Sequence, residues 1–219
     1  MSSKILVLPG DGIGVEVADQ AIRVIEKLNE QGLNASYEKD LVGGASYDVN
    51  GEPLTNSVLE KAKNSDAVLL GAVGGSKWDD VERSKRPEAG LLGLRKELEL
   101  FANLRPALVF DALVSASTLK NEVVNNLDIM IVRELTGGVY FGQPRGIEDT
   151  PNGKKAIDTQ IYYDYEIDRI ARVAFDLARK RNNKVTSVEK ANVMETGVLW
   201  REIVKETHKD FSDITLENM

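Results

Sequence analysis

The segment KILVLPGDGIGVEVADQAIRVIEKLNEQG (residues 4–32) predicts a strand, a glycine-rich turn and an amphipathic helix in succession. A short buried strand is expected over 4–9, and the turn GDGIG follows it at 10–14. Apolar residues then recur at helical spacing until Gly32 ends the helix. This order of elements is typical of an α/β domain.

The same alternation continues toward residue 100. ASYEKDLV (35–42) predicts a strand, and Thr55 is a suitable N-cap for a helix over 56–64. DAVLLGAVGG (66–75) is a continuous apolar run that ends in glycines, which is typical of a central parallel strand reaching a ligand-facing edge. Residues 1–100 are therefore expected to form a first domain with β-α-β-α-β order.

The pattern changes after residue 100, so residues 101–219 are expected to form a second domain. Pro-Asn-Gly between two alternating segments predicts a protruding hairpin over 147–164. Amphipathic helices are expected at 165–181 and 194–209. The other predicted strands are 102–110, 127–135, 138–142, 184–193 (which enters a loop) and 213–219.

Composition excludes several classes of protein. The net charge of −7 over 219 residues argues against a nucleic-acid partner. Without cysteine there is no thiolate nucleophile or Cys-ligated metal, and the single histidine, His208, has no GxSxG motif to accompany it. The N-terminal apolar run ILVL is too short for a signal peptide, and no stretch approaches a membrane span. A cytoplasmic enzyme with no membrane partner is expected.

Basic residues near a tyrosine are the candidates for chemistry. Three guanidiniums converging on one pocket would suit a small substrate with two carboxylates, because each planar fork binds a carboxylate bidentately. A tyrosine and a lysine beside them would supply groups that move protons. The candidates are Arg95 and Arg105 in PEAGLLGLRKELELFANLRP (87–106), Arg133 and Tyr140 in VRELTGGVYFGQPRG (132–146), and Lys190 in VEKANV (188–193).

Each candidate also has a simpler interpretation. Arg95, Tyr140 and Lys190 taken alone could be a surface charge, a core tyrosine and a solvated lysine. Arg105 lies in an otherwise apolar strand, so a buried partner is expected for its charge. Arg133 could pair with the glutamate that follows it, although alternation along a strand would point the two side chains to opposite faces.

Two glycine-rich loops are weaker signals. GDGIG (10–14) has G-x-G-x-G spacing rather than G-x-G-x-x-G, so a tight turn that lets the backbone approach a ligand is favoured over a dinucleotide fingerprint. GGSKWDD (74–80) follows a buried strand, where α/β proteins place ligands, but an ordinary loop is equally compatible with it.

Taken together, LPGDGIG, LLGAVGG, LFANLRP, VRELTGGVYFG and VEKANV resemble motifs of the β-decarboxylating dehydrogenases of 3-isopropylmalate, isocitrate, homoisocitrate and tartrate. The resemblance runs from residue 4 to residue 219. It implies the isopropylmalate dehydrogenase-like two-domain α/β fold, with a cofactor-side domain over 1–100 and part of a substrate and dimerisation domain over 101–219. Family members continue past this point, so a fold truncated at the C-terminus is expected.

Within that family, PEAGLLGLRKEL resembles the 3-isopropylmalate version. The resemblance implies that Leu91 and Leu92 form an apolar wall for the isopropyl group, that Val193 completes the pocket, and that Glu88 lies between this group and the nicotinamide. Two leucines offer hydrocarbon, whereas the third carboxylate of isocitrate requires polar or cationic donors. Burying a branched alkyl group contributes roughly 1.5–3 kcal/mol, which gives useful discrimination.

The resemblance also implies the catalytic roles. Arg95, Arg105 and Arg133 would bind the malate carboxylates and hydroxyl region. Lys190 would act as general base, and Tyr140 would protonate the enol carbon after loss of CO2. A divalent Mg2+ or Mn2+ would polarise the ketone.

Cofactor and partner assignments follow from the same resemblance. Lys190 and Val193 would come from the partner subunit, so a homodimer with shared active sites is implied, and the hairpin at 147–164 would be the arm that interlocks the subunits. The aspartate metal ligands would lie beyond Met219, so the 219-residue chain is expected to be inactive by itself. The residues implied to face NAD are Ile13, Gly75, Ser76, Lys77, Trp78, Glu88 and Asn192.

The expected function is NAD-dependent oxidative decarboxylation of 3-isopropylmalate to 4-methyl-2-oxopentanoate and CO2 in leucine biosynthesis. One alternative is a related enzyme for tartrate, isocitrate or homoisocitrate. Another is a non-catalytic regulatory subunit, against which the retention of all five candidate residues argues. A third is a fragment without function, which would expose apolar strand edges.

Overall fold

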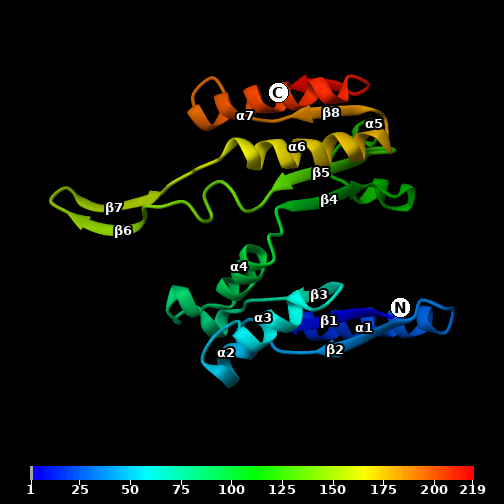
Figure 1. Cartoon of the computed structure of the whole chain (residues 1–219), viewed down its shortest axis with the longest axis vertical. Coiled ribbons are helices and arrows are strands. Elements are labelled where there is room, and N and C mark those ends of the chain that lie inside the picture. The colour runs from blue at the N-terminus through cyan, green and yellow to red at the C-terminus, as the bar shows by residue number, and fades with distance from the viewer. Residues whose placement is uncertain (1) are drawn as a thin grey trace. The chain divides into compact units, whose positions relative to one another are not determined.

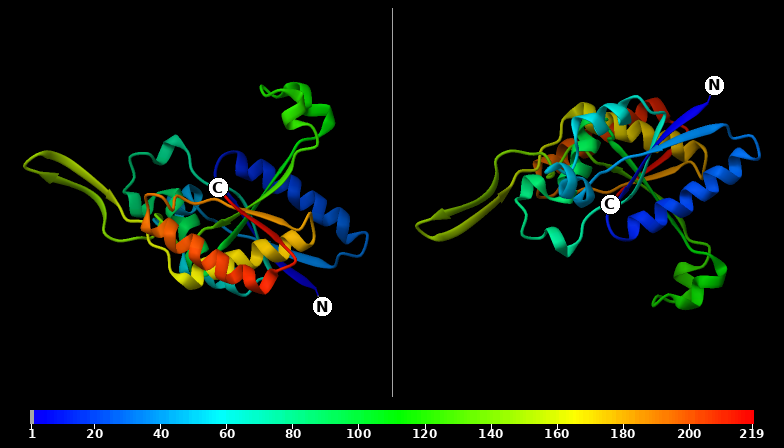
Figure 2. Two further views of the ribbon diagram at one scale, coloured as in Figure 1. Left: turned by 90° about the horizontal axis from the view of Figure 1, so that it is seen from above. Right: turned by 90° about the horizontal axis from the view of Figure 1, so that it is seen from below.

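The computed structural model describes residues 2–219. The chain folds into two compact units, Met1–Glu99 and Leu100–Met219, and each is described by itself. Figure 1 shows the elements of each unit along the chain, and Figure 2 shows them from two further sides.

The first unit is built on a three-stranded parallel sheet of order β2-β1-β3. The strands are β1 (Ser3–Gly10), β2 (Ala35–Lys39) and β3 (Ala67–Ala72). The prediction that the apolar run at 66–75 is a central strand is wrong for the part of the chain that the structure describes. There β3 pairs only with β1, and β1 occupies the centre.

Helices cover both faces of this sheet because successive strand residues point to opposite sides. Val7 packs against α1 (Ile13–Asn29), whereas Leu6 and Leu8 pack against the side that carries α3 (Asn56–Lys63) and α4 (Pro87–Glu97). The predicted N-cap of α3 is confirmed, since the Thr55 hydroxyl accepts a hydrogen bond from the amide of Val58 at 3.3 Å.

One helix of this unit, α2 (Gly44–Asn50), was not predicted from the sequence. The predicted strand over 35–42 ends earlier, at Lys39, and the chain turns into α2 through Gly43. Gly43 and Gly51 both have positive φ angles, 75° and 76°, at the two ends of the helix. A helix of 7 residues between glycines carries too few apolar positions to show a helical period.

The second unit contains two pairs of strands and two long helices. β4 (Ala102–Leu108) is antiparallel to β5 (Asp128–Glu134), and β8 (Lys184–Ser187) is parallel to β9 (Thr215–Asn218). The predicted amphipathic helices are observed as α6 (Asp164–Arg179) and α7 (Glu195–His208). Their apolar faces form a core around Phe175, whose side chain is fully buried against Ile167, Val204 and Phe211. A short helix, α5 (Asn121–Val124), precedes β5.

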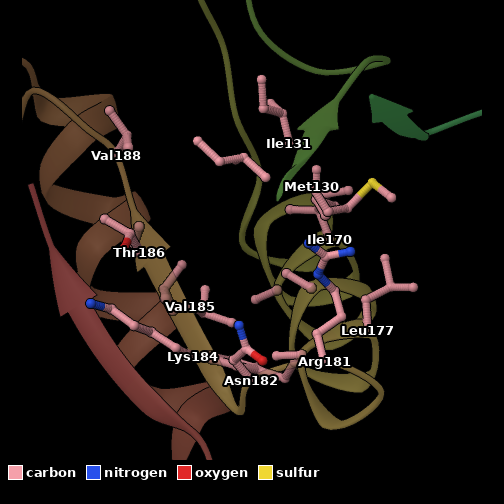
Figure 3. Close-up of a pocket in the computed structure, with 18 of the residues that line it drawn as sticks. Met130, Ile131, Ile170, Leu177, Arg181, Asn182, Lys184, Val185, Thr186 and Val188 are labelled. Atoms are coloured by element: carbon pink, nitrogen blue, oxygen red, sulfur yellow. The ribbon is translucent and has the colours of Figure 1, made fainter. Parts of the chain in front are cut away.

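A pocket of about 530 Å3 is lined by side chains of β5, α6 and β8 (Figure 3). Met130 and Ile131 of β5, Ile170 of α6, and Val185 of β8 are among the side chains that line it. Within residues 2–219, β5 pairs only with β4 and β8 only with β9, so each has an unpaired edge. Apolar side chains of β4 and β5 are also exposed to solvent. The hypothesis of a non-functional fragment predicts such exposure, but exposed apolar side chains occur in functional proteins as well.

The predicted protruding hairpin is confirmed. β6 (Arg145–Thr150) and β7 (Gly153–Asp158) pair in antiparallel register and extend away from the helices of their unit, as Figures 1 and 2 show.

The predicted strand over 138–142 is wrong, because only Gly138 forms a bridge, to Ile161. Gly138 has a φ of 85°, which a β-strand does not accommodate, and residues 139–141 form a turn. Tyr140 therefore lies on a loop after β5.

The remaining short elements are 3-10 turns at Ser76–Trp78, Arg83–Lys85, Asp111–Ala116 and Lys209–Phe211. No helix within residues 2–219 is long and apolar enough to cross a membrane.

Candidate active site

Helix α4 places four of the predicted site residues on one of its faces. Glu88, Leu91, Leu92 and Arg95 are spaced i, i+3, i+4 and i+7, which puts them on one stripe of an α-helix. The residues that face the core are instead Pro87, Gly90 and Leu94. The stripe therefore combines a carboxylate, two hydrocarbon side chains and a guanidinium on a single rigid element.

The side chains at the two ends of this stripe are differently placed. Glu88 lies against the loop after β3, since a Cβ on Gly74 would come within 2.7 Å of its Oε1. Arg95 is half-buried and makes no hydrogen bond or ion pair with any other residue in 2–219. An arginine without an internal partner remains available for a carboxylate ligand.

Asp11 connects three loops of the first unit, a role that the sequence did not reveal. Its carboxylate is 4% exposed and accepts backbone hydrogen bonds from Gly44 at 2.8 Å, Ala45 at 2.7 Å and Gly74 at 2.9 Å. The turn after β1, the start of α2 and the loop after β3 are thus joined at one point. An acid inside a glycine turn that directly follows a strand was the only local signal for this role.

The residues implied to face NAD in the first unit divide into two kinds. Ile13, the first residue of α1, is 61% exposed, and Gly75 and Ser76 are exposed on the loop after β3. These positions leave backbone and an apolar side chain open to a ligand.

Lys77 and Trp78, in contrast, are already bound to α2. Asp48 accepts hydrogen bonds from the Lys77 ammonium at 2.5 Å and from the Trp78 indole at 3.1 Å. These two hydrogen bonds, that of Lys77 first, lower the pKa of the Asp48 carboxyl. The Trp78 ring also lies directly over Gly44. Both side chains therefore connect the loop to α2, and the Lys77 side chain remains 66% exposed.

In the second unit the structure brings Arg133 and Tyr140 together. The Arg133 guanidinium donates to the Tyr140 hydroxyl at 2.7 Å, and its carbon lies 5.3 Å from the centre of the ring. Arg133 is opposite Asn103 in the sheet, and Arg105 is two residues further along β4, so both arginines project from the same face.

The expectation of a buried partner for Arg105 is wrong. Its side chain is exposed, and it has no hydrogen bond or ion pair among residues 2–219. Ile131, directly opposite it on β5, is itself 51% exposed, so this face of the sheet leaves the guanidinium in water.

The possible pairing of Arg133 with Glu134 does not occur. Strand alternation sends Glu134 to the opposite face of β5, where it is buried and pairs with Arg169 of α6 at 3.1 Å.

Lys190, Asn192 and Val193 lie together on the loop between β8 and α7, and all three are exposed. Lys190 borders a pocket of about 200 Å3 with Tyr162, Thr196 and Trp200 among its neighbours. Its ammonium has no hydrogen-bond or ion-pair partner in the described part of the chain. Burial, followed by the nearby charge of Glu134, raises the pKa of Tyr162.

The candidate residues therefore form three groups: the α4 stripe, the Arg105, Arg133 and Tyr140 group, and the loop of Lys190. That the first group meets the others around one substrate stays a prediction. Residues 2–219 contain no group of three His, Cys, Asp or Glu side chains that could hold a metal ion.

The chain belongs to the isocitrate/isopropylmalate dehydrogenase family, whose sequence pattern matches residues 4–219. The expected resemblance is therefore confirmed. Among the proteins similar to this chain are several 3-isopropylmalate dehydrogenases. The chain is 62% identical over 218 residues to that of Rhodopseudomonas palustris strain BisB18, covering 98% of this chain and 59% of the relative. It is 57% identical to that of Chromohalobacter salexigens, covering 100% and 61%.

Solved structures agree with this assignment of the fold. Isocitrate dehydrogenase from Methylococcus capsulatus is similar with a TM-score of 0.76 and 30% identity, over 99% of this chain and 60% of that one. A β-decarboxylating dehydrogenase from Thermococcus kodakarensis gives 0.73 and 31%, over 99% and 57%. The chain spans about 60% of the length of the curated relatives that it matches.

Proposed function

We propose that this chain supplies active-site residues for the NAD-dependent oxidative decarboxylation of 3-isopropylmalate to 4-methyl-2-oxopentanoate and CO2, in leucine biosynthesis. The observation that carries the choice of substrate is the α4 stripe. It places Leu91 and Leu92 between Glu88 and Arg95 on one helix face. A substrate with an alkyl branch beside a carboxylate matches this order of groups, and the names of the curated relatives support the same choice.

Substrate binding is assigned to the guanidiniums. Arg95, Arg105 and Arg133 would hold the two carboxylates and the hydroxyl region of the malate. Arg95 and Arg105 have no partner among residues 2–219, and the only hydrogen bond of Arg133 goes to a neutral hydroxyl. Each guanidinium therefore keeps donors for the substrate.

Proton transfer is assigned to Lys190 and Tyr140. Lys190 would take the proton of the substrate hydroxyl, and NAD, when bound, supplies the acceptor for the hydride that leaves C2. Loss of CO2 from the carboxylate on C3 then leaves the electron pair of the broken bond in an enolate, and Tyr140 would donate a proton to its C3 carbon, which restores the ketone. Because the Tyr140 oxygen accepts from Arg133, the hydroxyl hydrogen is left free to point elsewhere.

The cofactor assignments are supported by exposure. Ile13, Gly75, Ser76 and Asn192 are open to a ligand, and Glu88 borders the loop after β3. Each of these residues would contribute to binding NAD when the cofactor is present. Lys77 and Trp78 would act mainly by holding this loop on α2. A Mg2+ or Mn2+ ion, when bound, would polarise the ketone.

We further propose a cytoplasmic homodimer with shared active sites. Lys190 and Val193 would enter the site of the partner subunit, and the β6–β7 hairpin would be the interlocking arm. The exposure of both side chains and the extension of the hairpin away from its own unit support this arrangement.

The test uses a chimera in which the 219-residue chain replaces the matched part of the R. palustris relative, and the remainder of that dehydrogenase stays in place. NADH formation is measured with 3-isopropylmalate, isocitrate and tartrate. We expect 3-isopropylmalate to be preferred, and Leu91→Ala to lower its kcat/KM by about 10- to 200-fold. Equal turnover of isocitrate would contradict the assigned substrate, and binding without NADH formation would favour the regulatory-subunit alternative.

A further inference from the structure

We propose that Glu134, together with Arg169, is a positioning residue that fixes the loop carrying Tyr140. The inference rests on the proposed function, because it concerns how Tyr140 is held for proton transfer. Neither residue is expected to touch the substrate. Both lie on the helix-covered side of β5, opposite the face from which Arg133 and Arg105 project.

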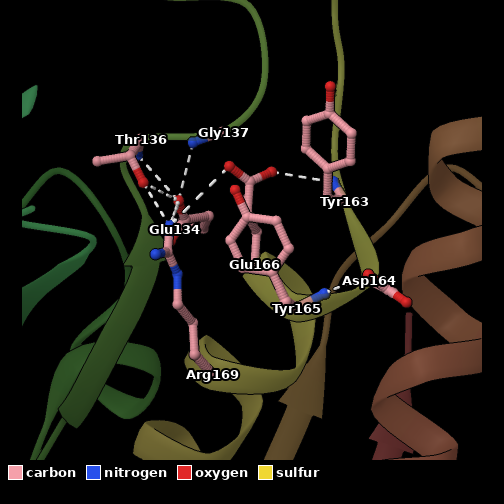
Figure 4. Close-up of polar contacts among 8 residues, drawn as sticks. All are labelled: Glu134, Thr136, Gly137, Tyr163, Asp164, Tyr165, Glu166 and Arg169. Carbon is pink, nitrogen blue, oxygen red and sulfur yellow. Dashed lines mark hydrogen bonds and ion pairs between the residues drawn. The ribbon is translucent and has the colours of Figure 1, made fainter.

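The first observation is the set of hydrogen bonds on a single oxygen of Glu134. Its Oε1 accepts from the amide of Thr136 at 2.9 Å, the hydroxyl of Thr136 at 2.7 Å and the amide of Gly137 at 2.8 Å (Figure 4). Arg169 donates to the same oxygen at 3.1 Å and to the Thr136 hydroxyl at 2.5 Å. The backbone at 136–137, immediately before the Tyr140 turn, is thereby tied to the end of β5.

The second observation is that the backbone of Gly137 and Gly138 has no free space on the side away from Glu134. A Cβ on Gly137 would come within 2.8 Å of the Glu166 carboxylate and 2.9 Å of the Tyr162 ring. The amide of Gly138 donates to the carbonyl of Ile161 at 2.7 Å. The backbone at 136–138 is therefore enclosed between Glu134 on one side and residues 161–166 on the other.

The third observation concerns Tyr140 itself, which lies two residues beyond the enclosed backbone at 136–138. Its hydroxyl accepts from Arg133 at 2.7 Å, and its backbone carbonyl accepts from Arg145. Arg133 and Glu134 are adjacent in β5 but point to opposite faces. One holds the hydroxyl of Tyr140, and the other holds the backbone that leads to it.

The energetics favour positioning over simple stabilisation. The Glu134 side chain is 1% exposed, yet its Oε2 and the Nε of Arg169 have no hydrogen-bond partner among the described residues. A buried ion pair that leaves polar atoms unpaired is an inefficient source of stability. The Arg169 guanidinium is also confined by two aromatic rings, with Phe101 at 4.5 Å and Tyr165 at 5.4 Å from its carbon. The pair fixes one geometry.

The test combines two readouts on Glu134→Ala, which removes the acceptor of the Thr136 and Gly137 amides. The matched control is Glu122→Ala, because Glu122 is an exposed carboxylate of the same unit. In the 219-residue chain, hydrogen exchange at the Gly137 amide should become faster in Glu134→Ala and stay unchanged in the control. In the chimera described above, kcat for 3-isopropylmalate should fall by about 10- to 100-fold, as a displacement of about 1 Å would produce, with KM nearly constant.

The decisive comparison is a double-mutant cycle with Tyr140→Phe. If Glu134 acts through Tyr140, Glu134→Ala should have little further effect on kcat in the Tyr140→Phe background. An equal loss of kcat in both backgrounds would overturn the proposal, as would unchanged kcat and exchange in Glu134→Ala.

The proposed function can fail separately. Unchanged turnover in Tyr140→Phe alone would overturn the role of Tyr140, whatever the exchange data show. If Glu134→Ala does not fold, Thr136→Val removes only the hydroxyl from the network and should give a smaller change of the same kind. An unaltered Gly137 exchange rate and kcat in Thr136→Val would then overturn the proposal.

Discussion

Replacing Asp11 should weaken the first unit by an amount that depends on how many amides lose their acceptor. In Asp11→Ala, the amides of Gly44, Ala45 and Gly74 all lose it. Each buried donor left unsatisfied costs about 1–3 kcal/mol, and two of these bonds are only partly buried, so we expect a total loss of about 3–5 kcal/mol.

Asp11→Asn should cost less, because the amide oxygen can still accept on one side. Gly44 and Gly74 both donate to Oδ2, whereas Ala45 donates to Oδ1. An asparagine with its oxygen at the Oδ2 position keeps two of the three bonds and loses one, at about 1–3 kcal/mol. The order of stability is therefore Asp11, then Asn, then Ala.

Urea unfolding followed by Trp78 fluorescence measures this series. The chain has two tryptophans, so a Trp200→Phe background leaves a reporter in the first unit alone. Asp80→Asn is the matched control, because Asp80 is exposed and its side chain makes no bond to another residue in 2–219. A loss of less than about 1 kcal/mol in Asp11→Ala would refute the reasoning.

Three further outcomes are expected. In the chimera, Tyr140→Phe and Lys190→Ala should each abolish most NADH formation and leave the proposed dimer intact in size-exclusion chromatography; near-normal turnover would contradict their assigned roles. A hydrogen bond from Arg179 lowers the pKa of Asp213 to about 2. Because this folded-state value lies below the ordinary 3.8, the stabilisation is complete above about pH 4 and is lost as pH falls toward 2, so Asp213→Asn should flatten the pH dependence of unfolding in that window. Phe175→Ala should destabilise the second unit by about 3–5 kcal/mol in urea, since the fully buried ring leaves a cavity, and a loss below about 1 kcal/mol would show that the core relaxes around it.

Patterns within a few residues of one another were predicted well. The strand, turn and helix at the start of the chain, the Thr55 cap and the β6–β7 hairpin all appear where local spacing placed them. The helix, the cap and the hairpin depend mainly on interactions between near neighbours, which a short stretch of sequence encodes, whereas the first strand also pairs with the distant strands β2 and β3. Helix α2 was not predicted, and the strand predicted over 138–142 was wrong, because hydrophobic spacing does not show where glycines adopt positive φ angles.

The sequence by itself determined the residue types of the candidate site and, through motifs in their order, the family. It also determined that Arg133 and Glu134 point to opposite faces, since that follows from strand alternation alone. Only the tertiary structure decided which groups those side chains meet. Asp11 finds amides 33 to 63 residues away, and Glu134 finds Arg169 35 residues away. Such contacts exist only after the chain has folded back on itself, so no local period in the sequence records them.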